Sequence, residues 1–591
     1  MSRDVEPNAA MDDKVSAAES PRAYVRHTVI ANPGTRPTFA TILSILGLLA
    51  CLAMFLAIGG LLVYGSDRGL DLTDEIFYLI WARDPNAYAL IYQPFGYLLH
   101  PLFELCRGNL QAYRLTGFAI AAGAGALLGY SLFPSRQRGR SAIYGAGSAL
   151  TIFFPWIITP SYNSAANVGA MMAVAGIVTI RTSSSHRRLG GTLASAAGLC
   201  MSAFAKPPLC AILAGVMLML AVLSRNARVR VYLLASLALG AALTTLFIAP
   251  WDMLPLFRRI VVTQDVLKLP NSALGLPVKI ARDWLIVPPL LTLAAIAAAI
   301  GLALPLRASP KWWGYAAALL SAVYILSITP EAIEGSTPDF LGLALSAAAA
   351  GYFGVRRDDP TLPRLPIALL LAAPAAVALG TFNNQWAQMT YSMAFPFLAL
   401  FALGSTDPAA WRRGIVLGFA LIGPLAVMLF AAFYPYSLQD SLFEQRTLVE
   451  HPITHDPVRV DEDTAAFVDS ADNQAKGALI VDLSGTGPGV AAVLGAKAPV
   501  LPWLNPATES WPDVVWSKLS LKERQRAWFA GPVIPLFRQS APAKWLASNQ
   551  SKYCRLELSP MIFWDKERTI EVWRPCTNGE EPGDHSLEAR P

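Results

Sequence analysis

The chain has 591 residues, of which 54% are hydrophobic and only 15% are charged. Soluble globular proteins carry about 25% charged residues, so the composition excludes an ordinary soluble enzyme. The net charge of +6 does not indicate nucleic-acid binding, because the basic residues lie in short clusters between apolar runs. These runs have about the 17 to 25 residues that a helix needs to cross a bilayer. The sequence therefore predicts a polytopic membrane protein.

The N-terminal 39 residues are polar and rich in alanine, proline and charge. They are too long for the charged start of a signal peptide, and we interpret residues 1–39 as a disordered cytoplasmic tail. Hydropathy then predicts a transmembrane domain over residues 40–433 with about thirteen helices. The predicted spans are residues 40–64, 113–133, 141–159, 165–180, 190–205, 207–223, 231–250, 285–306, 312–329, 339–355, 364–380, 388–403 and 414–433.

The distribution of lysine and arginine orients these helices. With residues 1–39 inside, every predicted inside loop is basic, whereas several outside loops contain neither residue, as the positive-inside rule requires. An odd number of spans then places residues 434–591 outside. Because the chain is rich in alanine and uses arginine more than lysine, we expect a bacterial inner membrane protein with residues 434–591 in the periplasm.

The first outer loop, residues 65–112, contains an apolar stretch from Ala87 to Cys106 that polar residues and two prolines interrupt. Unpaired polar groups are costly in lipid. Counting this stretch as a span would also invert every later loop and break the charge rule. We therefore predict one or two helices that lie along the outer membrane interface.

The same loop contains the sequence GLDLTDEIFYLIW, residues 69–81, in which Asp74 and Glu75 directly precede an aromatic-rich segment. One interpretation is a solvated loop in which Thr73 or Asp74 caps a helix that begins at Glu75. The other is a general base, because partial desolvation and neighbouring charges tune the pKa of a carboxylate at a membrane boundary. The residues alone leave both open.

The sequence LTDEIFYL follows the first predicted span. In sequence and in position it resembles the Asp-Glu motif in the first extracytoplasmic loop of GT-C glycosyltransferases. These membrane enzymes use polyprenyl-phosphate-linked sugars and include protein mannosyltransferases and lipid A aminoarabinose transferases. The layout is similar too, with an acidic first loop and a domain after the last span. The resemblance implies an α-helical GT-C-like fold with a C-terminal extracytoplasmic α/β domain.

The resemblance also implies a mechanism. Asp74 would deprotonate the hydroxyl of a glycan, lipid or protein acceptor, which displaces the lipid phosphate at the anomeric carbon with inversion. Glu75 would be a supporting acid that orients a basic residue.

This chemistry needs cations beside the leaving phosphate, where negative charge develops. Lys206 lies at the outer end of a predicted span, in the sequence AFAKPPL, and an ionisable residue there is a functional candidate. The outer loop 251–284 is basic where few basic residues are expected, which an anionic headgroup or lipid phosphate would explain. For each cation, snorkelling at the interface remains an alternative. The candidates in this loop are Arg258, Arg259, Lys268, Lys279 and Arg282.

Other outer segments give weaker signals. Residues 159–167 and 381–392 are polar, and they either contact sugar hydroxyls or form caps and turns. Glu331, Glu334 and Asp339 could hold a divalent cation, although we expect a solvated loop. The sequence predicts no other cofactor.

Residues 434–591 are no longer membrane-like, and strand patterns such as GALIVDL and CRLELS predict a small α/β domain. The Gly-rich segment 484–495 lacks dinucleotide-binding spacing and is predicted to form a tight turn between a strand and a helix. Cys554 and Cys576 flank a predicted hairpin. In an oxidising compartment they would form a disulfide bond; the alternative is two independent thiols.

Three other functions compete with transfer from a lipid monophosphate. A ligase that moves a whole glycan from a lipid diphosphate would need similar groups. A transporter or flippase would need polar residues within the spans or two related halves, and neither is evident. A non-catalytic scaffold would explain the outer domain but not the acidic first loop.

Overall fold

The computed structural model describes residues 39–91, 93–133, 137–251, 253–267, 275–303, 311–330, 338–381, 383–436, 440–504, 509–563, 566–568 and 570–577. The chain forms two compact units that divide after Leu46. The larger unit, from Gly47 onward, contains every described helix after α1 and all the described strands.

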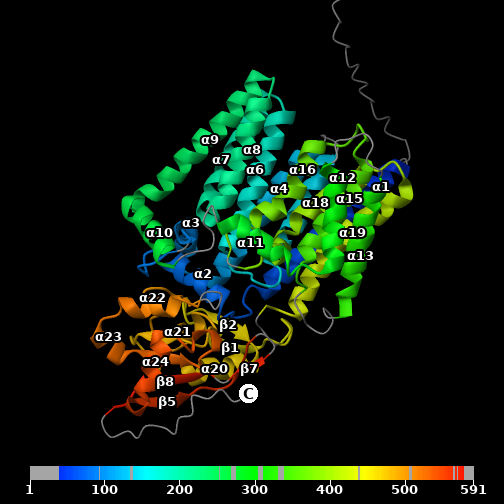
Figure 1. Ribbon diagram of the computed structural model, residues 1–591. Coiled ribbons are helices and arrows are strands. Elements are labelled where there is room, and N and C mark those ends of the chain that lie inside the picture. The colour runs from blue at the N-terminus through cyan, green and yellow to red at the C-terminus, as the bar shows by residue number, and fades with distance from the viewer. Residues whose placement is uncertain are drawn as a thin grey trace, which may run out of the picture. The chain divides into compact units, whose positions relative to one another are not determined.

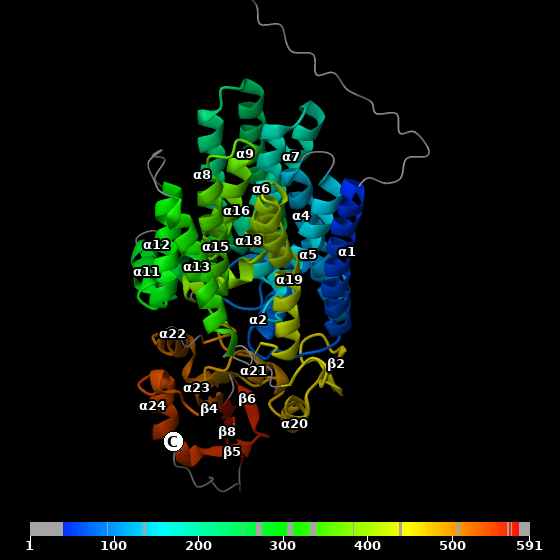
Figure 2. The ribbon, with the colours of Figure 1, turned by 90° about the vertical axis from the view of Figure 1, so that its right-hand side faces the viewer.

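Each of the thirteen segments predicted from hydropathy contains a helix, as the ribbon views show (Figures 1 and 2). Long apolar runs account for this, because only a helix satisfies its backbone groups within one segment, and α16 and α19 remain helical despite an internal proline. The helices are α1 (Phe39–Gly65), α4 (Leu110–Leu132), α5 (Arg138–Ala149), α6 (Tyr162–Thr182), α7 (Ser185–Ala205), α8 (Pro207–Leu223), α9 (Ala227–Ile248), α12 (Pro289–Ala303), α13 (Trp312–Ser327), α15 (Leu341–Arg356), α16 (Arg364–Val377), α18 (Ala394–Ser405) and α19 (Ala410–Phe433).

In the described residues, five helices are long and apolar enough to cross a membrane, namely α1, α4, α6, α9 and α19. A sixth candidate is a helix pair bent by 59°, in which α17 (Gln385–Gln388) and the 3-10 turn η4 (Met389–Ser392) lead into α18. Helices α8, α12, α13, α15 and α16 are apolar but shorter. The structure is therefore that of a helical protein with several apolar helices compatible with a membrane.

The helix predicted over residues 141–159 is shorter than expected. Helix α5 continues only through the 3-10 turn η2 (Leu150–Phe153). Pro155 follows, and a proline disfavours helical backbone in the residue before it. The next helix, α6, then begins at a capping box in which Ser161 and Ser164 bond each other's backbone N–H groups, and this start fixes the position of Tyr162.

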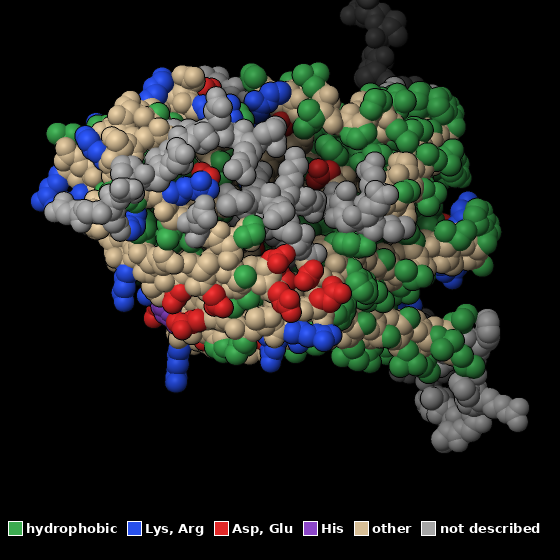
Figure 3. All heavy atoms as spheres, turned by 90° about the horizontal axis from the view of Figure 1, so that it is seen from below, with side chains coloured by type: hydrophobic (Ala, Val, Ile, Leu, Met, Phe, Trp, Pro, Cys, Tyr) green, Lys and Arg blue, Asp and Glu red, His purple; other side chains and the backbone are tan. Residues whose placement is uncertain are grey.

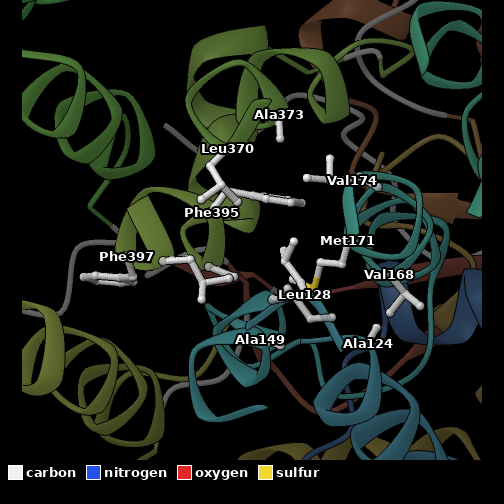
Figure 4. Close-up of a cluster of buried hydrophobic side chains, with 14 of the residues drawn as sticks. Ala124, Leu128, Ala149, Val168, Met171, Val174, Leu370, Ala373, Phe395 and Phe397 are labelled. Carbon is white, nitrogen blue, oxygen red and sulfur yellow. The ribbon is translucent and has the colours of Figure 1, made fainter. Parts of the chain in front are cut away.

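The core of the helical region is packed with aliphatic and aromatic side chains. Figure 4 shows Met171 and Val174 of α6 lying among Leu128 of α4, Leu370 of α16 and Phe395 of α18. All these side chains are buried. The shared core fixes α6 relative to its neighbours.

The first loop forms two short helices, α2 (Asp74–Arg83) and α3 (Phe95–Leu105). Helix α3 has 11 residues and is about 16 Å long, too short for a hydrocarbon core of about 30 Å. The stretch from Ala87 to Cys106 is therefore not one spanning helix, as predicted. Two further short helices, α10 (Met253–Leu267) and α11 (Gly275–Trp284), follow α9.

The C-terminal region contains strands and short helices, as its sequence predicted. Strands β1 (Thr447–Glu450) and β2 (Pro457–Val460) form an antiparallel ribbon, and β6 (Met561–Phe563) pairs with β7 (Lys566–Arg568). The main sheet has the order β3 (Ile480–Asp482), β4 (Trp528–Gly531), β8 (Glu571–Pro575) and β5 (Tyr553–Glu557), with β3 parallel to β4. The helices are α20 (Glu462–Ala471), α21 (Gly489–Val493), α22 (Trp511–Lys518), α23 (Leu521–Arg526) and α24 (Ala541–Ser548).

Strands β5 and β8 bring the two C-terminal cysteines together, and Cys554 and Cys576 form a disulfide bond with 5.0 Å between their Cα atoms. The four other cysteines are free thiols.

Acidic side chains gather on the face seen from below (Figure 3). Burial raises the pKa of Asp440, and the neighbouring acids Asp461 and Glu444 raise it further.

Candidate functional site

The acidic sequence of the first loop is organised around Asp71. Its Oδ1 accepts hydrogen bonds from the Thr73 amide (2.9 Å) and the Thr73 hydroxyl (2.6 Å), and its Oδ2 accepts from the amides of Asp74 (3.0 Å) and Glu75 (3.1 Å). The interpretation that Thr73 or Asp74 caps this helix is correct only for the position. Thr73 is the N-cap residue, but its side chain makes no capping hydrogen bond, and the helix begins at Asp74 rather than Glu75. Asp71 satisfies the free amides instead, which leaves the Asp74 carboxylate available for other contacts.

Two tyrosine hydroxyls hold the Asp74 carboxylate. Tyr78, one turn along α2, donates to Oδ1 at 2.8 Å, and Tyr436 donates to Oδ2 at 3.1 Å. Burial raises the pKa of Asp74, and the two donated hydrogen bonds oppose this rise. A carboxylate with a raised pKa is a better proton acceptor near neutral pH than an ordinary one, and Asp74 remains partly exposed.

Glu75 has a different environment, because it forms a buried ion pair with Arg114 of α4. Burial alone would raise the pKa of Glu75, but the charges of Arg114 and His451 and the hydroxyl of Thr159 lower it overall. Arg114 also donates to the carbonyls of residues 66, 68 and 69. Glu75 therefore orients a basic residue, and the pair ties the first loop to α4.

Arg114 was missed at the sequence level because it lies inside a predicted span. The available signal was an arginine one turn into an apolar helix, a position where an ionisable residue marks a site or a buried partner. It is 1% exposed.

Lys206 lies at the break between α7 and α8 and is 1% exposed. Its Nζ donates to the carbonyl of Val377 at 2.8 Å, and among the described residues no carboxylate lies within ion-pair distance. Burial lowers the pKa of Lys206 to about 7. A buried ammonium without a counter-ion is costly, so the position is suited to an anion that arrives from outside the chain.

One aromatic cluster connects Lys206 with Asp74. The Lys206 Nζ lies 5.4 Å from the ring centroid of Tyr162, and that ring meets the ring of Tyr78 edge-on at 5.6 Å. The hydroxyl of Tyr78 donates to Asp74. Phe95 of α3 contacts both tyrosines, and Tyr391 of η4 packs against the same cluster. The structure thus brings together a base and a cation predicted from segments 132 residues apart.

The basic candidates of loop 251–284 are not equivalent. Arg259 donates to Asn86 (2.7 Å), to the Tyr97 hydroxyl (2.8 Å) and to a backbone carbonyl, so it holds the first loop. Lys279 pairs with Asp283 at 2.8 Å. Arg258 and Arg282 are exposed. Lys268 lies outside the described residues.

Among the described residues, buried polar atoms without hydrogen-bond partners lie on α6, α17 and η4. They include Oδ1 of Asn163 and Asn167, Oε1 of Gln388 and Oγ of Ser392. Helix α6 and η4 contact each other. These atoms come from the two polar segments, 159–167 and 381–392, that the sequence connected with sugar hydroxyls, and buried polar groups of this kind need a hydrogen-bonding partner.

A cavity of about 540 Å³ lies beside the aromatic cluster of Tyr78, Phe95 and Tyr162, between α3, α4, α6, α7 and α9. Its lining is almost entirely apolar and includes Leu98, Val168, Met201 and Phe247. Pro160 and Ser164, which also line it, flank Tyr162 in the chain. A volume of this size fits part of a hydrocarbon chain and lies within the usual range for ligand sites.

In the described ranges, no group of three or more His, Cys, Asp or Glu side chains is arranged to hold a metal ion. Glu331 and Glu334, two of the three acids named as possible cation ligands, lie outside those ranges.

Comparisons of the sequence with protein-family models and with curated proteins find no match.

Proposed function

We propose that this protein is a membrane glycosyltransferase of the GT-C type, which moves a sugar from a polyprenyl-phosphate donor to an acceptor hydroxyl. One observation carries the proposal. The partly exposed carboxylate of Asp74 and the buried ammonium of Lys206, which pairs with no described carboxylate, both contact the Tyr78–Tyr162 pair. A base and a cation in one site are what such a displacement requires.

In the proposed reaction, Asp74 accepts the proton of the acceptor hydroxyl. The oxygen then forms a bond to the anomeric carbon of the sugar, while the bond between that carbon and the phosphate oxygen breaks. The electron pair of the broken bond stays on the polyprenyl phosphate, and the charge of Lys206 stabilises it. Attack opposite to the leaving group inverts the configuration, and Asp74 later returns its proton to water.

The surroundings of the two residues support a lipid-linked sugar. The apolar cavity beside Tyr162 suits an isoprenoid chain, because its lining offers almost no polar contact. The unpartnered polar atoms on α6, α17 and η4 suit a sugar, which carries many hydroxyl groups. The presence of this cavity also disfavours the scaffold, which needs none.

We also propose a number of membrane spans and a side of the membrane for the first loop and for residues 434–591. About thirteen spans would place the first loop and residues 434–591 on the periplasmic side of a bacterial inner membrane. The disulfide bond between Cys554 and Cys576 supports an oxidising compartment for that domain.

The experiment uses purified wild-type protein in nanodiscs with a panel of radiolabelled polyprenyl-monophosphate and polyprenyl-diphosphate sugars and an envelope extract as acceptor. Release of polyprenyl monophosphate with transfer of label to the extract supports the proposal. Turnover of diphosphate-linked glycans alone would assign the ligase function, and turnover of no donor by folded protein would overturn the proposal.

A further inference from the structure

The Gly-rich segment predicted as a tight turn does connect a strand with a helix, β3 with α21, and it contacts the acidic loop directly. The amide of Gly489 donates to the carbonyl of Leu72 at 2.8 Å. A Cβ atom on Gly489 would lie 2.3 Å from that carbonyl oxygen and 2.4 Å from the Leu72 Cβ. Because real Cβ atoms do not approach so closely, this contact requires glycine at position 489.

The turn is held in shape by Asp482, at the end of β3. Its carboxylate accepts hydrogen bonds from the amides of Ser484 (2.9 Å) and Gly487 (3.2 Å) and from the Ser484 hydroxyl. In a phosphate-binding turn such amides face an external anion. Here the chain supplies its own anion, so the turn is a structural element whose outer side is free to contact the first loop.

The contact lies within two residues of the proposed base. Leu72 follows Asp71, whose carboxylate binds the first amides of α2, including that of Asp74. Gly487 also abuts Thr73, since a Cβ there would lie 3.1 Å from the Thr73 Cα. A displacement of the turn would therefore move the start of α2, and Asp74 with it.

Two further contacts from the C-terminal region hold the same loop. Tyr436 donates to Asp74, and β2 pairs with residues 67–69 through backbone hydrogen bonds of 2.9 Å on both sides of Arg459. The ribbon views show α2 between the apolar helices and the C-terminal domain (Figures 1 and 2).

We infer that the Gly-rich turn of residues 484–489 positions the acidic loop, so that the C-terminal domain is part of the transfer apparatus. Gly489 is a positioning residue, since it acts through Leu72. The inference rests on the proposed function for the role of Asp74, but the contact itself has a readout that needs no activity.

The test compares Gly489→Ala with Gly190→Ala, a matched change on α7 where an added Cβ meets no atom within 4 Å. Amide hydrogen exchange is measured at residues 69–76, and transfer is measured against pH. In Gly489→Ala we expect exchange there to rise at least about tenfold and kcat to fall about 100-fold. The acidic limb of the profile should move to lower pH, because water entering a loosened loop lowers the pKa of Asp74. Gly190→Ala should resemble wild type in every readout.

Wild-type exchange, kcat and pH profile in folded Gly489→Ala would overturn the inference while leaving the proposed function intact. If wild type transfers no sugar but Gly489→Ala still exposes residues 69–76, the positioning contact stands and the proposed function fails. If Gly489→Ala is not recovered as folded protein, Asp482→Asn loosens the turn at constant size. Wild-type behaviour of folded Asp482→Asn would overturn the inference equally.

Discussion

The hydroxyl of Tyr436 donates a hydrogen bond of 3.1 Å to Oδ2 of Asp74 across 362 positions of sequence. With Tyr78 on the other carboxylate oxygen, it holds the carboxylate from both sides. The base proposed for the reaction is thus oriented by its own helix and by the segment that follows the last apolar helix.

Replacing Tyr436 by phenylalanine should move the pH profile. The tyrosine hydroxyl stabilises the ionised form of Asp74, so its loss raises the pKa further and shifts the acidic limb of kcat/KM to higher pH. The matched control is Tyr113→Phe, because the buried Tyr113 hydroxyl has no hydrogen-bond partner among the described residues. An unshifted limb in Tyr436→Phe would show that this bond does not act on the base.

The wild-type pH profile of kcat/KM should be bell-shaped. Asp74 accepts a proton only when ionised, so activity rises as the pH increases through its raised pKa. Lys206 binds phosphate only when protonated, and burial lowers its pKa to about 7, so activity falls above that pH in the free enzyme. Because arginine does not deprotonate, Lys206→Arg should lose the falling limb. A falling limb that persists in Lys206→Arg would contradict this assignment.

Lys206→Met should weaken binding of the donor without destabilising the fold. Loss of a charged hydrogen bond to the donor phosphate should raise KM about 10- to 100-fold. Removal of a buried charge without a counter-ion should leave the thermal midpoint unchanged or higher. Lys476→Met is the control, since Lys476 is exposed in the C-terminal region. An unchanged KM in Lys206→Met would remove Lys206 from the donor site.

Arg114→Met should destabilise the protein strongly. It leaves Glu75 buried without its ion-pair partner, which costs about 3–5 kcal/mol. The double variant with Glu75→Met should recover part of the loss, because no unpaired charge remains. Thermal unfolding in detergent, followed by size-exclusion chromatography, measures both. A double variant less stable than Arg114→Met would show that the pair is not the source of the effect.

Hydropathy and charge predicted the helical segments and the acidic loop because these depend on local sequence. The same local information failed at α5, where Pro155 shortens the helix, and at the cap of α2, where Asp71 replaces Thr73. It could not identify the pairing of Arg114 with Glu75 or the hold of Tyr436 on Asp74, because these contacts join segments far apart in the chain. The sequence singled out Lys206 as a candidate because a lysine beside two prolines interrupts an apolar run. It could not show that Arg259 holds the first loop, because Asn86, which accepts its hydrogen bond, lies 173 positions earlier in the chain.

The most direct test of the proposed mechanism compares Asp74→Asn with Asp84→Asn in the donor-consumption assay. Both changes remove one carboxylate from the first loop at constant size. Asp84 is exposed, and its carboxylate accepts a local hydrogen bond from the Asn86 amide. If Asp74 is the general base, Asp74→Asn should lose about 100- to 10,000-fold in kcat, while Asp84→Asn should transfer sugar like wild type. Full activity in correctly folded Asp74→Asn would contradict the mechanism.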